Sequence, residues 1–251
     1  MKTIDSFGNN IAVVIGTFVL FAFCLFPYPA RAQQQTSGAK SILQEFLDII
    51  GSGTTATTNQ STSSGNSISI TPSALIDLYR YVGNKVGVPA CVLEAVSYIE
   101  WPTAFNYTPE EVQLYSQPGQ RIPNCAPNTC SASGHMQMTT GIDPYGSASC
   151  SQCCWQGSCL SSCPNAWGSY GNAIQQYENI SHMPDVCNLT DSTYAAAQKL
   201  KNDSNTSPGD LNWSEEAMHR AGERYYGNCT VTYSRLGDRT YCGFIIHQCN
   251  L

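Results

Sequence analysis

Apolar residues recur at helical spacing from residue 71 onward, and this periodicity is the main structural signal in the chain. Thr71 and Pro72 suit the N-cap and the first position of a helix, and Pro89 suits the start of the next one. The second helix should end before Pro102, because the residue that precedes a proline disfavours helical geometry. The apolar face of the first helix comprises Leu75, Leu78, Tyr79, Val82 and Val86.

Further helices are predicted at 166–180, 192–201 and 212–226. Asp191 can cap the second of these. Asn212 and Glu215 have the spacing of a capping box for the third, which should stop before Gly227. Only the run 230–233 has the β-branched character of a strand. The pattern therefore predicts a mainly α protein.

Polar, low-complexity segments divide the chain into parts. Residues 33–70 are typical of a flexible linker, within which the amphipathic stretch 40–50 could form one short helix. The folded domain is predicted over 71–251. Inside that domain, 103–165 is loop-like and includes a Cys-rich insertion at 141–165.

The first 32 residues have the layout of an export signal peptide. Lys2 precedes an apolar stretch at 11–26, and the Ala-Arg-Ala sequence at 30–32 is a small-residue cleavage site. A membrane helix needs about 20 apolar residues, so cleavage is favoured over an uncleaved anchor. Asp5 and the weakly positive start leave the anchor as the alternative, and only then would the protein be bound to a membrane.

Charged residues make up 12% of the 251 residues, about half the usual share, and the formal net charge is -6. The chain has no run of lysine and arginine, so nucleic-acid binding is not expected. A polar polymer of low charge, such as a glycan, is compatible with this composition. We predict no cofactor and no metal.

Twelve cysteines come after the signal peptide. An even number in an exported chain indicates up to six disulfides, whose pairing the spacing does not give. The cluster at 150–163 has a zinc site as its alternative interpretation, but it lacks an intact pair of C-x-x-C knuckles. Disulfides are therefore favoured, which places the protein in an extracellular, periplasmic or cell-wall location.

Glu100 has an unusual position for a charged residue. In a helix it falls four residues after Val96 and seven after Leu93, on the apolar face. Loss of hydration there would raise its pKa, and raising it by one to two units requires roughly 1.4 to 3 kcal/mol. A carboxylic acid that stays protonated near neutral pH is what a glycosidase uses as general acid.

Short motifs around and after Glu100 resemble those of the goose-type lysozyme and soluble lytic transglycosylase family, which cuts peptidoglycan. That family has a glutamate at the end of a helix, as in Val96-Ser-Tyr-Ile-Glu100, and then G-L-M-Q-[IL], here Gly134-His-Met-Gln-Met138. Its later A-A-x-Y-L and A-Y-N-A-G segments correspond to Ala195-Ala-Ala-Gln-Lys-Leu200 and Met218-His-Arg-Ala-Gly222. The resemblance covers about 72–227.

The resemblance implies a lysozyme-like fold and cleavage of the β-1,4 bond between N-acetylmuramic acid and N-acetylglucosamine in peptidoglycan glycan strands. Glu100 would protonate the leaving oxygen and then, as a carboxylate, remove the proton from the sugar's own 6-hydroxyl. The product would be a 1,6-anhydro sugar, formed without an activated water.

Residues of the later motifs are predicted to bind the glycan. Gln137 offers a donor and an acceptor to sugar hydroxyl and acetamido groups, and Gly134 permits close approach of the backbone. Met136 lies between them in the same segment, with core packing as its competing interpretation. The rings of Tyr225 and Tyr226 suit sugar faces, although they too could pack into the core.

The chain also departs from the family pattern. Trp101 stands where a serine usually comes after the glutamate, and His135 replaces the leucine before Met-Gln. The tyrosine of the last motif is either replaced by His219 or displaced to another position. We expect His219 to be structural or exposed. The insertion at 141–165 would change the walls of the site. Asp143 would be a second carboxylate if the reaction were hydrolysis.

A rival from another class is a non-catalytic, disulfide-rich glycan-binding or surface-assembly protein that retains the fold. An exposed, salt-bridged Glu100 would favour this rival, whereas a buried Glu100 facing a groove shared with Gln137 would favour the enzyme. A role within envelope secretion or pilus machinery is compatible with the enzyme, because such machinery needs local cutting of the wall.

Overall fold

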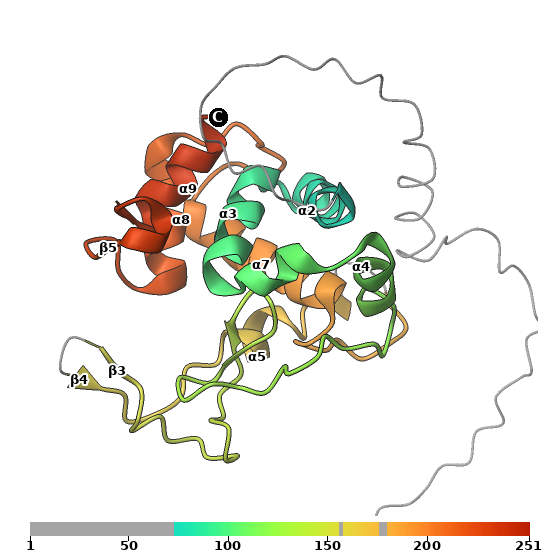
Figure 1. The fold of residues 1–251 in the computed structure, drawn as a ribbon, viewed down its shortest axis with the longest axis vertical. Helices are drawn as coiled ribbons and strands as arrows, with labels where there is room; N and C mark the ends of the chain where they lie inside the picture. The colour runs from blue at the N-terminus through green and yellow to red at the C-terminus, as the bar shows by residue number, and fades with distance from the viewer. Residues whose placement is uncertain (1–72, 156–157, 176–179) are drawn as a thin grey trace, which may run out of the picture. The chain divides into compact units, whose positions relative to one another are not determined.

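The computed structural model describes residues 73–155, 158–175 and 180–251. The predicted signal peptide and the linker lie outside these residues. In the described part, five longer helices form the body of the protein (Figure 1). They are α2 (Ser73–Val86), α3 (Ala90–Glu100), α7 (Leu189–Ser204), α8 (Glu215–Tyr226) and α9 (Tyr241–Cys249). The prediction of a mainly α protein is confirmed.

Helix α7 is packed on several sides, against α2, α3 and α8. Three consecutive alanines, 195–197, are fully buried, because small side chains let neighbouring helices approach from more than one direction. The helix is longer than the predicted 192–201. Its N-cap is Asn188, whose side-chain oxygen accepts hydrogen bonds from the backbone N–H groups of Thr190 and Asp191. Asp191 therefore lies in the first turn and is not the cap.

Helix α3 lies against both α2 and α9. A disulfide between Cys91 and Cys249 joins the first turn of α3 to the end of α9. A second disulfide, Cys229–Cys242, joins the segment after α8 to the start of α9. Helix α9 is thus held covalently near both of its ends.

The periodicity did not predict every helix correctly. The predicted helix 166–180 is interrupted, because α5 (Ala166–Tyr170) is followed by a turn at 171–173. Residues 174–175 are helical again, and 176–179 lie outside the described residues. Gly168 and Gly171 lower the helical propensity of this segment. Helix α8 begins after Ser214, which caps it in place of the predicted Asn212, and it ends before Gly227 as predicted.

The stretch predicted as a loop contains short elements. They are η1 (Pro102–Asn106), α4 (Pro109–Tyr115), β1 (Ala132–Ser133), β2 (Met138–Thr139), β3 (Cys154–Trp155) and β4 (Ser158–Cys159). Helix α4 has a capping box in which Thr108 and Glu111 bond each other's backbone N–H groups, a signal that was visible in the sequence. Each strand pair forms an antiparallel hairpin, β1 with β2 and β3 with β4.

A third hairpin and a last short helix connect α8 to α9. They are β5 (Thr232–Tyr233), η2 (Ser234–Leu236) and β6 (Arg239–Thr240). The strand expected at 230–233 is thus confirmed for its last two residues. Among the described residues, no helix is long and apolar enough to cross a membrane.

All twelve cysteines from Cys91 onward form disulfides, as expected. The pairs are 91–249, 125–187, 130–153, 150–163, 154–159 and 229–242. The cluster for which zinc was the alternative is therefore occupied by disulfide bonds. Disulfides in such number are typical of an oxidising compartment outside the cytoplasm.

Replacing Cys91 and Cys249 together by alanine should lower the free energy of unfolding strongly. This bond closes a loop with a sequence separation of 158, for which the chain-entropy relation gives about 5 kcal/mol. Urea or guanidinium unfolding of the oxidised variant measures the loss. The matched control is the Cys154→Ala/Cys159→Ala pair, with a separation of only 5, which should cost much less. An equal loss in both variants would contradict the expectation.

Candidate functional site

Glu100 is the last residue of α3, and the residue after it ends the helix. Trp101 leaves helical geometry with φ -145° and ψ 72°, as expected of a residue before Pro102. The carboxyl group therefore lies at the negative end of the helix dipole, which disfavours its ionised form. Leu93 and Val96 are fully buried, so the predicted apolar face is confirmed.

Burial raises the pKa of Glu100 from 4.5 to about 7, although two neighbours act in the opposite direction. The hydroxyl of Tyr241 donates a hydrogen bond of 2.8 Å to Oε1 of Glu100, and the charge of Arg235 attracts the carboxylate. Loss of hydration is the largest of these effects. The residue as a whole keeps an intermediate exposure, although its carboxyl group is crowded by protein atoms.

Tyrosines surround this carboxyl group. The rings of Tyr226 and Tyr241 stack with centroids 4.5 Å apart and planes 7° apart, and the hydroxyls of Tyr226 and Tyr233 lie 2.6 Å from each other. Burial, and then the charge of Glu100, raise the pKa of both Tyr225 and Tyr241. The site is therefore a set of neutral hydroxyl groups around one carboxyl of raised pKa.

Tyr225 connects this set to the turn between β1 and β2. Its hydroxyl donates to the carbonyl oxygen of Met136 at 2.6 Å and lies 3.2 Å from the sulfur of Met138. The structure thus places the glutamate, the Gly134–Met138 segment and the end of α8 in one region, as the predicted site requires. Met136 is fully buried, and Tyr225 and Tyr226 are partly buried. This agrees with the alternative interpretation that these residues pack into the core.

The side chain of Gln137 makes its hydrogen bonds within the protein. Its amide nitrogen donates to the carbonyl oxygen of Gly134 at 2.8 Å, and its amide oxygen accepts from the amide nitrogen of Asn128 at 3.1 Å. Gln137 and Gly134 both have positive φ, at 49° and 74°. A Cβ atom on Gly134 would collide with the carbonyl oxygen of Val186, so only glycine fits there.

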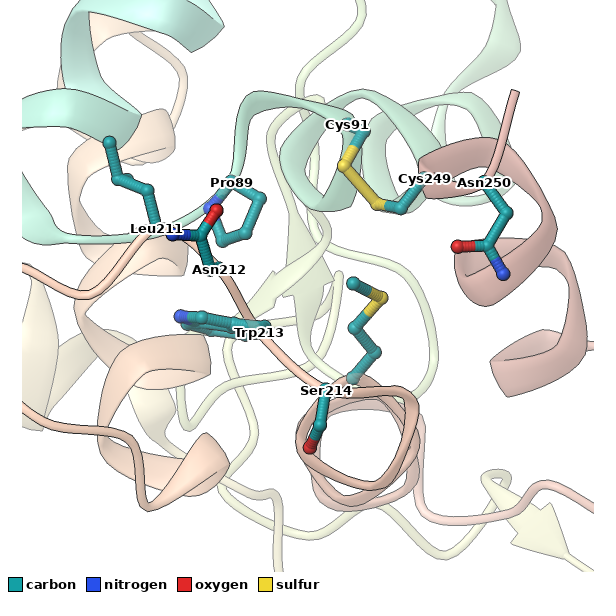
Figure 2. Close-up of a pocket in the computed structure, with 9 residues that line it drawn as sticks. Pro89, Cys91, Leu211, Asn212, Trp213, Ser214, Cys249 and Asn250 are labelled. Carbon is teal, nitrogen blue, oxygen red and sulfur yellow. A yellow bond between two sulfur atoms is a disulfide. The ribbon is translucent and has the colours of Figure 1, made fainter.

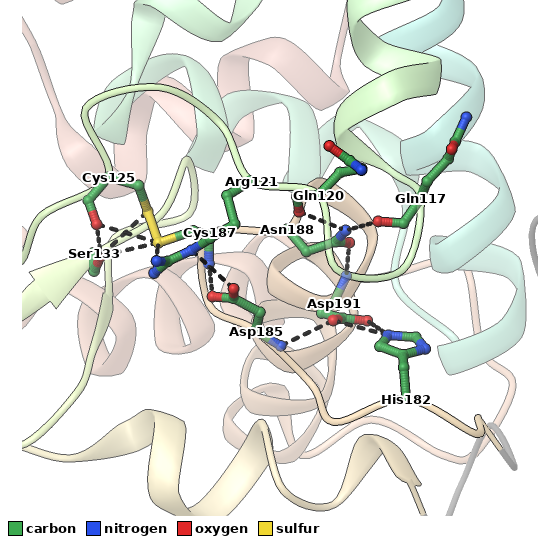
Figure 3. A network of polar contacts seen from close by, with 10 residues as sticks. All are labelled: Gln117, Gln120, Arg121, Cys125, Ser133, His182, Asp185, Cys187, Asn188 and Asp191. Carbon is green, nitrogen blue, oxygen red and sulfur yellow. Dashed lines mark hydrogen bonds and ion pairs between the residues drawn. A yellow bond between two sulfur atoms is a disulfide. The ribbon is translucent and has the colours of Figure 1, made fainter.

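A polar network holds the segment 182–191, whose Val186 packs against Gly134 (Figure 3). Arg121 pairs with Asp185 at 2.9 Å, and Nε2 of His182 lies 3.0 Å and 3.1 Å from the two oxygens of Asp191. Burial raises the pKa of Asp191. The disulfide Cys125–Cys187 joins the same two stretches of chain. This network sets the position of the turn and takes no part in the group around Glu100.

Sequence reasoning missed Tyr241, Arg235 and Tyr233. The guanidinium of Arg235 donates to the carbonyl oxygen of Ile99 at 3.0 Å, which holds it at the end of α3. One local signal was available for Tyr241. The side chain of Thr240 caps α9 by accepting from the backbone N–H of Gly243, and an apolar run begins after that threonine.

Asp143 and His219, the other residues considered from the sequence, make their contacts away from Glu100. Oδ1 of Asp143 accepts from the backbone N–H groups of Tyr145 and Ser147 in a turn of the insertion. His219 is exposed, as expected, and its ring lies near the sulfurs of Cys229 and Cys242. Those two sulfurs are bonded to each other, so they are not thiolate ligands for a metal.

A separate open pocket of about 340 Å³ lies at the opposite end of α3 (Figure 2). Pro89 and the Cys91–Cys249 disulfide form one wall, and Leu211, Trp213 and neighbouring residues form the other. The eleven residues of α3 separate this pocket from Glu100 by about 16 Å along the helix. None of the residues predicted to form the site lines it.

No protein-family model, curated protein or solved structure matches this chain.

Glu100 and His135 should have opposite effects on stability as pH changes. Burial lowers the pKa of His135 from 6.5 to about 3. Below pH 6.5 the imidazole is therefore protonated in the unfolded chain but stays neutral in the folded protein. Through His135, the free energy of unfolding therefore decreases by about 1.4 kcal/mol for each unit by which the pH is lowered below 6.5. The raised pKa of Glu100 acts the other way between pH 4.5 and about 7, because there the folded protein binds the extra proton.

The two contributions should nearly cancel between pH 4.5 and 6.5 in the natural protein, and single variants separate them. His135→Leu should become more stable on acidification in this window, whereas Glu100→Gln should lose stability. Unfolding midpoints and free energies measured in urea at several pH values test this. Identical pH slopes for the natural protein and both variants would refute the assignment.

Tyr241→Phe should raise the pKa of Glu100 above its natural value of about 7, because the hydrogen bond that favours the carboxylate is lost. Titration of the Glu100 carboxyl carbon by NMR measures the change. Tyr226→Phe is the matched control, because its hydroxyl pairs with Tyr233. An unchanged midpoint in Tyr241→Phe would show that this hydrogen bond does not tune the carboxyl group.

Proposed function

We propose that the protein is an exported peptidoglycan lytic transglycosylase with a lysozyme-like fold. The observation that carries this proposal is the carboxyl group of Glu100, half protonated near neutral pH, among tyrosine hydroxyls and next to the Gly134–Met138 turn. An ordinary glutamate would be almost fully ionised at that pH and could not act as an acid. The substrate would be the glycan strand of peptidoglycan, as the motif resemblance implies.

Glu100 would act twice in this reaction. As an acid it donates its proton to the glycosidic oxygen, so that the bond to C1 breaks and the leaving sugar departs as an alcohol. As a carboxylate it then accepts the proton of the 6-hydroxyl while O6 bonds to C1. The proton on Glu100 is thereby restored, and no water is consumed.

Tyr241 has a defined role in this cycle. Its hydroxyl donates to Oε1, so it stabilises the carboxylate formed after the first proton transfer and leaves Oε2 for the sugar. The positive charge of Arg235, which is bonded to the carbonyl oxygen of Ile99, also favours the carboxylate. By favouring the carboxylate, these two groups oppose the effect of burial and keep the pKa of Glu100 from rising above about 7. A pKa near neutrality suits a group that donates and accepts a proton in turn.

The rival function is that of a non-catalytic glycan-binding or surface-assembly protein. Both ends of the Gln137 amide are bonded within the protein, which leaves it less capacity for sugar contacts and so favours the surface-assembly form of the rival over the glycan-binding form. The rival does not account for a carboxyl group kept out of water at an energetic cost. In an envelope secretion or pilus assembly, the enzyme would open the wall locally.

Purified murein should yield muropeptides with 1,6-anhydro ends when treated with the natural protein, and Glu100→Gln should abolish them. Loss of the ionisable acid typically lowers such rates by at least 10²-fold. Mass spectrometry of the soluble products measures both. The control is Glu216→Gln, whose side chain is 85% exposed on α8 and should leave the products unchanged.

Two results would change the proposal. Reducing ends in place of anhydro ends would identify hydrolysis, with a water in place of the 6-hydroxyl. No cleavage of several wall preparations by the folded natural protein would favour the non-catalytic rival.

A further inference from the structure

The described residues of the Cys-rich insertion, 141–155 and 158–165, form an arm that projects from the helical body (Figure 1). Asp143 is its only acidic or basic residue, and most of the others are small or polar uncharged residues and cysteines. The arm therefore offers hydroxyl groups, amides and a few apolar side chains. It has little to attract a charged partner.

Disulfides make the arm a fixed structure. Cys150–Cys163 and Cys154–Cys159 lie inside it, and Cys130–Cys153 ties it to the preceding loop. At its root, the backbone N–H of Gly141 donates to the carbonyl oxygen of Pro164 at 2.9 Å. A surface held in this way loses little conformational freedom when it binds a partner.

The arm presents a tyrosine to solvent on a defined turn. Oδ1 of Asp143 accepts from the backbone N–H of Tyr145 at 2.9 Å and from that of Ser147 at 2.7 Å. The carboxylate of Asp143 thus forms its hydrogen bonds within the turn, and the other side chains of the turn are uncharged. Tyr145 is 79% exposed, and Ile142 and Leu160 are also exposed. A neutral surface with an exposed aromatic ring suits the apolar faces of sugars.

Asn128 connects Cys130, which is bonded to the arm, with Gln137 of the candidate site. The backbone N–H of Cys130 donates to the side-chain oxygen of Asn128 at 2.9 Å. The side-chain nitrogen of the same Asn128 donates to Gln137 at 3.1 Å. Cys130 is in turn bonded to Cys153 of the arm. The arm is therefore held in a fixed relation to the turn that carries Gln137.

We propose that the arm is a second glycan-binding surface, which contacts a polymeric murein strand beyond the sugars held at Glu100. This inference rests on the proposed function and narrows its substrate to long strands. A protein partner is less well matched, because protein interfaces depend on a central, tightly packed cluster of large side chains. The large apolar residues of the arm are few, and serines lie among them in the sequence.

The test is binding of the full chain to purified, protein-free murein sacculi, measured by co-sedimentation. All variants carry Glu100→Gln, so that cleavage does not disturb the measurement. Adding Tyr145→Ala should weaken binding about tenfold, the loss expected for one stacked ring. Tyr145→Phe keeps the ring and should retain binding. Met183→Ala is the matched control, because Met183 is 84% exposed outside the arm and should have no effect.

Each other outcome has a defined meaning. Unchanged sacculus binding by the folded Tyr145→Ala variant, with its thermal unfolding preserved, overturns the proposal. Loss of binding only to crude envelopes, and not to protein-free sacculi, also overturns it and identifies a protein partner. Binding through Tyr145 without anhydro products from the natural protein would support the arm and refute cleavage. Cleavage with binding independent of Tyr145 would refute the arm alone.

Discussion

The candidate site depends on the removal of water from one carboxyl group. Glu100 lies at the end of α3, and α9 supplies the tyrosine that bonds it. Loss of hydration outweighs both this hydrogen bond and the attraction of Arg235, which leaves the pKa at about 7. Keeping Glu100 ionised in the folded protein therefore costs about 3 kcal/mol. The packing of the surrounding helices must supply that free energy.

The position of Glu100 could be predicted because it is a local property. Helical spacing from Leu93 and Val96 decides which face the side chain shares, and Pro102 decides where the helix ends. Tyr241 could not be found in this way, since it contacts Glu100 across 141 residues of sequence. That contact exists only because α3 and α9 pack together, and periodicity carries no information about which helices become neighbours.

The turn at 134–138 shows a second limit of sequence reasoning. Gly134 could be identified as a position of close backbone approach, and the structure supplies the backbone that approaches it, at Val186. The amide of Gln137 could be identified as a hydrogen-bonding group, but its partners could not. They are Asn128 and the carbonyl oxygen of Gly134, and both depend on the shape of the loop.

The two disulfides that hold α9 link the acidity of Glu100 to oxidation. In a reduced chain, the start and end of α9 are joined to the body only by packing, and undocking of this helix removes Tyr241 and returns water to the carboxyl group. Glu100 then titrates as an ordinary glutamate. Once both bonds have formed, the docked state is retained together with its raised pKa. Oxidation of these two cysteine pairs therefore restricts undocking of α9 and helps to keep water away from the carboxyl group of Glu100.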